Sequence, residues 1–132
     1  MVDILASAIE MEMDLHGELR DRQAQLLKKA KAFILARIDQ TDLTIETISQ
    51  ALHVSPRTLN RVFASEGTTV IKWLWKERLE ASYATLSEGR ATQVIDAAAG
   101  CGFTNSSHFS RMFKAAYGVL PHTFLRNPEQ RH

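Results

Sequence analysis

The sequence predicts an all-α protein in which two helix-turn-helix subdomains are joined by a long connecting helix, about seven helices in total. Apolar residues recur at helical spacing along most of the chain, and no run rich in Val, Ile and Tyr between turn residues indicates a strand. A nine-residue segment also nearly repeats itself: residues 55–63 read SPRTLNRVF and residues 105–113 read NSSHFSRMF. The repeat predicts one small helical unit that is used twice.

Composition limits the size and class of the protein. A chain of 132 residues forms one domain or two very small ones. Its 45% hydrophobic and 23% charged content is typical of a soluble globular protein. No apolar run approaches the roughly 18 residues of a membrane helix, and no signal peptide is recognisable. A single cysteine, Cys101, excludes an internal disulfide framework and favours a reducing cytoplasm.

The charge of the chain is divided unevenly. Residues 1–21 carry six acids and one base, a net charge of −5, whereas residues 22–132 carry 15 bases and 9 acids, a net charge of +6. The larger part therefore has the basic character expected of a nucleic-acid-binding body. We interpret residues 1–21 as an acidic helical linker or the remnant of an upstream domain; a regulatory contact is the less favoured alternative.

Residues 22–69 are expected to form the first subdomain. A loose amphipathic helix over Val2–Leu15 precedes it, and apolar residues at helical spacing predict its first helix over Gln23–Arg37. Thr44 can cap a short helix. Ser55 followed by Pro56 marks the start of the next helix, which ends near Gly67.

Residues 70–87 are expected to form the connecting helix, and residues 88–132 the second subdomain. The connecting helix is predicted over Val70–Leu86. The second subdomain repeats the plan of the first and closes with a turn of helix over His122–Arg126. Its two main helices are predicted over Gln93–Ala99 and Ser106–Tyr117, with a turn over Gly100–Gly102.

The two predicted helix-turn-helix units carry side chains that suit recognition of DNA bases. In such a unit the second helix lies in the major groove, where Arg pairs with guanine and Asn with adenine. Small residues are expected where the helices cross, over Ala97–Ala99 in the second unit. We predict outward, base-reading side chains at Arg57, Asn60 and Arg61 in the first unit, and at Ser106, Ser107, His108 and Arg111 in the second. Helix starts and candidate phosphate contacts are Ser55, Thr104 and Asn105.

Several of these residues have a simpler interpretation. Arg61 and Arg111 could contact only phosphate, and Ser106 and Ser107 could cap their helix. Trp73 and Trp75 suit core packing better than stacking on bases, and Cys101 suits a tight turn better than a redox switch. The histidines are scattered without the spacing of metal ligands, so neither a metal nor another cofactor is expected.

The segment GFTNSSHFSRMFKAAYGVLP, Gly102–Pro121, resembles the second helix-turn-helix of the AraC/XylS family of bacterial transcription regulators. The family pattern is GF, five residues, FSRxFK, a short gap and G-x-x-P; SPRTLNRVF, Gly67 and the Arg78-Leu79 pair agree with its first half. The resemblance covers roughly Leu26–Arg126. It implies seven helices in two subdomains, with recognition helices at Ser55–Ser65 and Ser106–Tyr117 entering successive major-groove faces.

Some positions depart from the family pattern. Ser49 stands where a small Ala is usual at the first helix crossing, and His53 where the turn commonly has Gly. Ser82 replaces an Ala of the connecting helix, and Leu125 replaces an Arg that often follows the closing aromatic, with Arg126 one place later.

The resemblance implies a cytoplasmic transcription regulator that binds double-stranded DNA, with RNA polymerase as a further partner if it is an activator. An effector or dimerisation domain, usual in this family, has no room in this chain. Because the two units differ in sequence, we expect an asymmetric two-part site. The alternative is a helical protein-interaction module; an enzyme is not expected, because no catalytic constellation is recognisable.

Overall fold

The computed structural model describes residues 2–91 and 93–125, and the side chains among them from residue 15 onward. Over these residues the chain forms six α-helices, a terminal 3-10 turn and no strand, which confirms the all-α prediction. The elements are α1 (Val2–Ala36), α2 (Ile45–Ala51), α3 (Pro56–Ala64), α4 (Val70–Ser87), α5 (Val94–Gly100), α6 (Ser106–Tyr117) and η1 (Pro121–Phe124). The predicted turn of helix over His122–Arg126 is therefore η1, and Arg126 lies outside the described residues.

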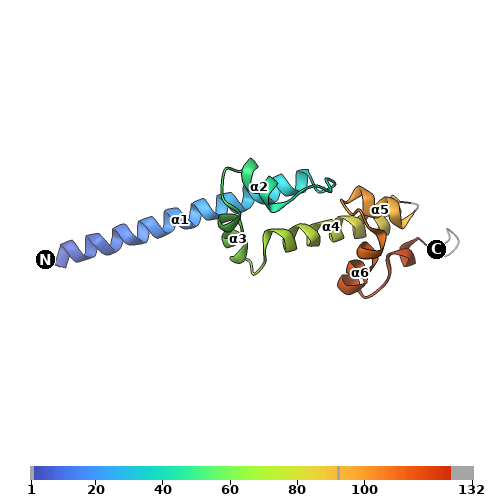
Figure 1. The fold of residues 1–132 in the computed structure, drawn as a ribbon. Helices are drawn as coiled ribbons and strands as arrows, with labels where there is room; N and C mark the ends of the chain where they lie inside the picture. Colours follow the sequence, from blue (N-terminus) through green and yellow to red (C-terminus); the bar gives the residue numbers. More distant parts are fainter. Residues whose placement is uncertain (1, 92, 126–132) are drawn as a thin grey trace.

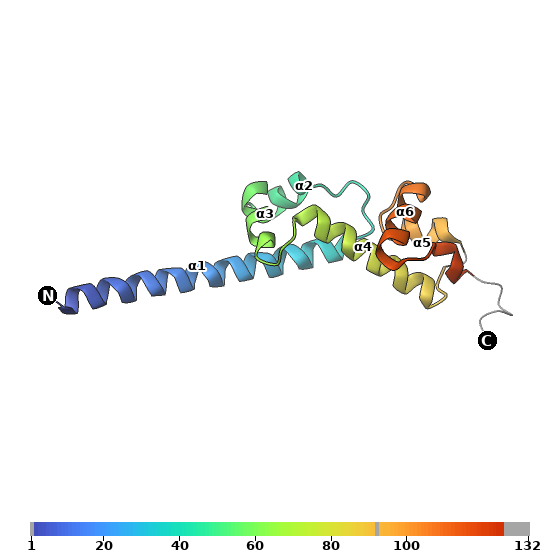
Figure 2. The same cartoon turned by 90° about the horizontal axis from the view of Figure 1, so that it is seen from below.

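Helix α1 is one continuous helix of 35 residues, whereas the sequence predicted two separate helices before residue 38. Residues 16–22 contain no proline, and the single Gly17 costs a helix interior only about 1 kcal/mol. Its N-terminal half projects away from the rest of the chain (Figures 1 and 2). Its C-terminal half packs on the first unit, where Ala30 and Ile34 are fully buried.

The first unit is held together by a core that α1, α2, α3 and the start of α4 share. Ile48, Leu59 and Phe63 have no exposed surface, and the Phe63 ring meets the edge of Trp73 with ring centroids 5.8 Å apart. Trp73 is thus a core residue, as the sequence favoured.

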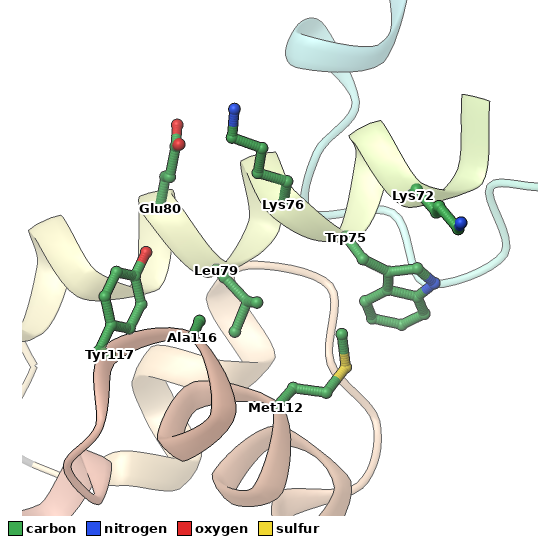
Figure 3. A pocket seen from close by; sticks show the side chains of 8 residues that line it. All are labelled: Lys72, Trp75, Lys76, Leu79, Glu80, Met112, Ala116 and Tyr117. Carbon is green, nitrogen blue, oxygen red and sulfur yellow. The ribbon is translucent and has the colours of Figure 1, made fainter. Parts of the chain in front are cut away.

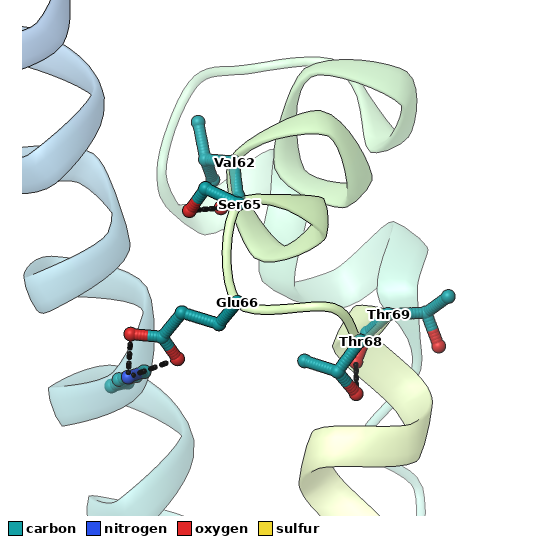
Figure 4. Close-up of polar contacts among 6 residues, drawn as sticks. Val62, Ser65, Glu66, Thr68 and Thr69 are labelled. Atoms are coloured by element: carbon teal, nitrogen blue, oxygen red, sulfur yellow. Dashed lines mark hydrogen bonds and ion pairs between the residues drawn. The ribbon is translucent and has the colours of Figure 1, made fainter.

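An ion pair joins α1 to the segment that follows α3. The Lys31 ammonium lies 2.7 Å from the Glu66 carboxylate, which reaches across to α1 in Figure 4. Both side chains are partly exposed, so the pair contributes at most about 1 kcal/mol. Beyond Glu66, Gly67 adopts a left-handed φ of 72°. Helix α3, which was predicted to end near Gly67, ends at Ala64.

The second unit has an aromatic core. Phe109 and Phe113 are fully buried, and Phe103 is nearly so. Successive rings pack against one another, with centroids 4.7 Å apart for Phe103 and Phe109 and 5.6 Å apart for Phe109 and Phe113.

Helix α4 connects the two units and contributes to both cores. Val70, Trp73 and Leu74 belong to the first core, whereas Leu79 and Leu86 belong to the second. Its 18 residues give a rod about 27 Å long. Figure 2 shows α3 beside the start of this rod and α6 further along it. In the part of the chain that the structure describes, no helix is long and apolar enough to cross a bilayer.

Candidate nucleic-acid interface

Each candidate recognition helix begins at a side-chain cap. Ser55 Oγ accepts a hydrogen bond from the Thr58 backbone N–H at 3.1 Å, and Asn105 Oδ1 accepts one from the His108 N–H at 3.1 Å. The predicted helix starts at Ser55 and Asn105 are confirmed, and Asn105, not Ser106 or Ser107, caps α6. Exposed caps with free N–H groups beside them suit contact with phosphate. Thr104, the third candidate, is exposed in the turn before α6.

Buried anchors fix which face of each recognition helix points outward. Leu59 and Phe63 in α3, and Phe109 and Phe113 in α6, are fully buried. An arginine that lies two residues before the second anchor is turned by about 200° from it, toward the opposite face. Arg61 and Arg111 occupy that position and are exposed. Among the residues that the structure describes, none forms an ion pair with either arginine.

The outward face extends on both sides of each arginine. Arg57 and Ser107 lie four residues before Arg61 and Arg111, on the same face, and both are exposed. Lys114, three residues after Arg111, is also exposed, and the two line one shallow pocket. Lys114 was not among the residues predicted from the sequence to contact DNA, although it closes the FSRxFK pattern.

Asn60 is less free to read a base than the arginines. The residue is half-buried, and its Oδ1 accepts a hydrogen bond from the Val70 N–H at 3.1 Å, at the first turn of α4. A bidentate contact with adenine needs both the acceptor and the donor of this amide. Because this oxygen already bonds Val70, only its second lone pair remains for adenine, and the amide can turn toward a base only within the limits of that bond.

His108 lies at the edge of the outward face, toward α4. It is exposed, and its ring meets Trp75 edge-on with centroids 5.5 Å apart. Trp75, Leu79 and Met112 line a surface pocket of about 470 Å³ between α4 and α6, and Figure 3 shows Met112 pointing up toward Trp75. Ser106, at the first position of α6, is exposed.

The turns of the two units share a backbone plan but differ in length. The Val54 N–H donates to Ser49 O at 3.0 Å, and the Phe103 N–H donates to Ala98 O at 2.9 Å. The residue before each donor has a left-handed φ, 57° at His53 and 89° at Gly102. From Val54 the cap of α3 follows at once, whereas Thr104 separates Phe103 from Asn105, so the second turn is one residue longer.

Small residues lie where the helices of each unit cross. Ser49 is 3% exposed and its hydroxyl donates to Glu46 O, which satisfies it inside the core. Ala97 and Ala98 are buried in the second unit, but Ala99 is exposed. The prediction of a crossing over Ala97–Ala99 was wrong for Ala99, because the third alanine of a run turns away from the face that the other two occupy.

Cys101 is buried in the second turn, and burial raises the pKa of its thiol above the usual value; weaker contributions from Thr85, Arg90 and Arg78 lower it. Within the described residues no group of three or more His, Cys, Asp or Glu could hold a metal ion.

Comparison with known proteins identifies the family. A model of the helix-turn-helix domain matches residues 48–127, more than half of the chain. The chain is 32% identical over 120 residues to the transcriptional activator NphR of Rhodococcus, a match that covers 91% of this chain. A probable AraC family transcriptional regulator from Rhodopseudomonas palustris superposes with a TM-score of 0.68 at 28% identity, over 81% of this chain and 96% of that one.

The chain belongs to the AraC/XylS family. The AraT C-terminal domain, from a response regulator of Geobacillus stearothermophilus, is a further match, with a TM-score of 0.70 and 31% identity over 76% of this chain and 84% of that one. The ornithine utilization regulator of Pseudomonas aeruginosa is 34% identical over 111 residues, 82% of this chain. Family membership makes the chain a helix-turn-helix DNA-binding module and not an enzyme, as the sequence predicted. The chain spans only 36% of NphR and 31% of the ornithine utilization regulator.

Proposed function

We propose that the chain is the DNA-binding part of a transcription activator and that it reads an asymmetric two-part site. Helices α3 and α6 would enter two successive major-groove faces on one side of the duplex. The observation that carries this proposal is the pair of exposed arginines, Arg61 and Arg111, held at the same helical position in two capped helices that pack at different places along α4. A duplex presents the same groove again after about 34 Å.

Two features support two different half-sites. The outward face of α3 carries two arginines, Arg57 and Arg61, whereas that of α6 carries Ser107, Arg111 and Lys114. Arginine favours guanine, whereas serine is tolerant of several bases. The turn before α6 is also one residue longer than the turn before α3, so the two recognition helices would meet the DNA in different orientations. A single chain with two unlike units has no reason to prefer a palindrome.

The remaining predicted contacts keep narrower roles in this proposal. Ser55, Thr104 and Asn105 lie at helix starts and would contact phosphate, together with Lys114. Asn60 and His108 lie on the sides of their helices that touch α4, and we assign them to the edges of the half-sites. A protein-interaction module without DNA binding remains the alternative, and family membership disfavours it.

Selection of bound duplexes from a random pool tests the proposal. We expect two unlike boxes whose centres are about 10 base pairs apart. In Arg61→Ala one box should lose information at one position, and in Arg111→Ala the other box should. A palindrome, or no enriched sequence, would contradict the proposal.

As part of an activator, the chain would also contact RNA polymerase. Lys72, Lys76 and Glu80 line the outer edge of the pocket between α4 and α6, and Lys76 and Glu80 point away from α6 in Figure 3. We propose that this mixed-charge edge of α4 is the surface that contacts RNA polymerase. Substitutions there should lower transcription from a bound promoter in a reconstituted assay without lowering DNA affinity; equal losses of both would contradict this assignment.

A further inference from the structure

Arg78 is a buried charge at the middle of α4. Its side chain is 1% exposed, and its guanidinium donates hydrogen bonds to two backbone carbonyls, from Nε to Ile38 O at 3.1 Å and from Nη2 to Gln40 O. Both carbonyls belong to the segment that leaves α1 and enters the first unit. Arg78 therefore ties the connecting helix to that segment.

The second unit meets the same guanidinium from another side. A Cβ atom added at Gly102 would lie 2.6 Å from Arg78 Nε and 2.6 Å from Ile38 O. Gly102 is buried, and its φ of 89° is favourable only for glycine. The turn that leads into α6 thus rests directly on the guanidinium and on the carbonyl that it binds.

An aromatic chain continues from this junction to α6. The guanidinium carbon of Arg78 lies 4.9 Å from the ring centroid of Trp75. The Trp75 ring in turn packs against Phe103, with centroids 5.1 Å apart, and against His108 of α6. The Arg78 side chain therefore contacts the segment that follows α1, the turn of the second unit, and Trp75, which packs against the second recognition helix.

Burial of a guanidinium opposite neutral carbonyls is costly, and desolvation lowers the pKa of Arg78. An apolar side chain would fill the same space without that cost. An apolar side chain could not make directional hydrogen bonds, whereas the planar guanidinium of arginine fixes the distance and angle of the carbonyls that it binds. In some proteins a buried polar group of this kind specifies one geometry among several.

We propose that Arg78 is a positioning residue that fixes the distance and rotation between the two recognition helices, and so the spacing between the two DNA boxes that the chain accepts. The inference rests on the proposed two-part site. One inserted base pair moves the second box by about 3.4 Å along the duplex and turns it by about 35°. A rigid junction rejects that change, whereas a loosened one tolerates it.

The test compares wild type with Arg78→Met and Arg78→Lys on duplexes whose boxes are one base pair closer, at the selected spacing, or one or two base pairs further apart. Methionine keeps an unbranched apolar stem, although it is shorter than arginine, and it donates no hydrogen bond; lysine keeps the charge without the fork. Circular dichroism melting establishes the temperature below which each variant is folded, and duplexes with a single box measure each unit alone. Lys29→Met removes an exposed cation from α1, outside every surface assigned above, and is the matched control.

We expect the wild type and Lys29→Met to prefer one spacing by about tenfold over its neighbours. Both Arg78 variants should lose most of that preference while they keep their affinity for single boxes. A folded Arg78 variant with the wild-type spacing profile would overturn the inference alone. A wild type without any spacing preference would overturn the proposed two-part site as well. If Arg78→Met does not fold, the result for Arg78→Lys decides the test. This variant keeps the positive charge but lacks the guanidinium fork, so a wild-type spacing preference in it would also overturn the inference.

Discussion

At the scale of single residues, the two arginines that face outward are set by their neighbours. Arg61 and Arg111 each precede a fully buried Phe by two positions, so the anchor directs the arginine away from the core. Their surroundings differ, because Arg57 accompanies Arg61 and Lys114 accompanies Arg111. We therefore expect their roles to be alike in kind and different in sequence preference.

Arg61→Ala and Arg111→Ala should each cost about 1–3 kcal/mol of specific binding and relax the preference at one base position. Lys114→Ala is the control: loss of a phosphate contact should weaken all sequences alike and reduce the salt slope by about one. Titration of matched and mismatched duplexes at several salt concentrations measures both effects. Arginine variants that retained wild-type discrimination would assign these residues to phosphate.

His53→Gly should raise the free energy of unfolding by about 0.5–1 kcal/mol. His53 holds a left-handed φ that glycine adopts without strain, and its equivalent in the second turn is Gly102. The reverse change, Gly102→Ala, should destabilise by more than 1 kcal/mol, because its Cβ would crowd the backbone at Ile38. Urea unfolding of the three proteins measures the difference; a destabilised His53→Gly would show that the imidazole makes a stabilising contribution of its own.

Cys101 should react slowly with iodoacetamide in the folded protein. Only the thiolate reacts, and burial both shields this thiol and raises its pKa. The same chain in denaturant should react at the rate of a free cysteine. Fast alkylation of the folded protein would instead support the redox switch that the sequence left open.

At the scale of helices, Asn60 links the first recognition helix to the connecting helix. Its Oδ1 accepts from the Val70 N–H, one of the N–H groups that an α-helix leaves without an internal partner. Thr69 caps the same end through the Lys72 N–H. The first turn of α4 is therefore bonded both locally and across to α3.

Asn60→Ala should lower the free energy of unfolding by about 1 kcal/mol, whereas Asn60→Asp should not, because a carboxylate still accepts from Val70 and is favoured at a helix N-terminus. Aspartate cannot donate to adenine. If Asn60 serves the helix junction, Asn60→Asp keeps both stability and base preference. If instead it reads adenine, Asn60→Asp stays stable but loses preference at one position, which thermal melting and duplex titration together distinguish.

Much of the secondary structure follows from local signals in the sequence. Ser55-Pro56 and Asn105 start α3 and α6 where predicted, because each supplies a cap that needs only neighbouring residues. Gly67, Gly102 and Gly118 take the left-handed conformations expected at turns. The continuity of α1 was missed, since a charged segment around one glycine gives no clear signal either for or against a helix.

At the scale of the whole molecule, the roles of side chains between elements were the least predictable. The sequence placed Asn60 and His108 on outward faces, which is compatible with helical periodicity. It could not show that the first bonds Val70 or that the second meets Trp75, because these contacts depend on how α3 and α6 pack on α4. The buried fork of Arg78 was equally invisible, since nothing local distinguishes a buried arginine from an exposed one.

The acidic N-terminal segment, residues 1–21, leads to a prediction about the whole molecule. Residues 1–21 carry a net charge of −5. Residues 2–21 form the projecting end of α1, a helix about 52 Å long (Figure 1). All described side chains from Leu15 to Gln25 are exposed, so deletion of residues 1–21 should leave the melting temperature unchanged.

The effect of this deletion on DNA binding should depend on salt. At about 0.01 M ionic strength the Debye length is about 30 Å, and removal of the acids should raise affinity by roughly two- to fivefold. At about 0.15 M it is about 8 Å, and the gain should vanish. The control is a full-length chain with amides at the six acids, Asp3, Glu10, Glu12, Asp14, Glu18 and Asp21, which should behave as the deletion does. If deletion of residues 1–21 still raised DNA affinity at the higher salt, these residues would have to lie close to the DNA or to the recognition helices. That outcome would favour a regulatory contact over a solvated linker, because only charges within a Debye length of the interface can act there.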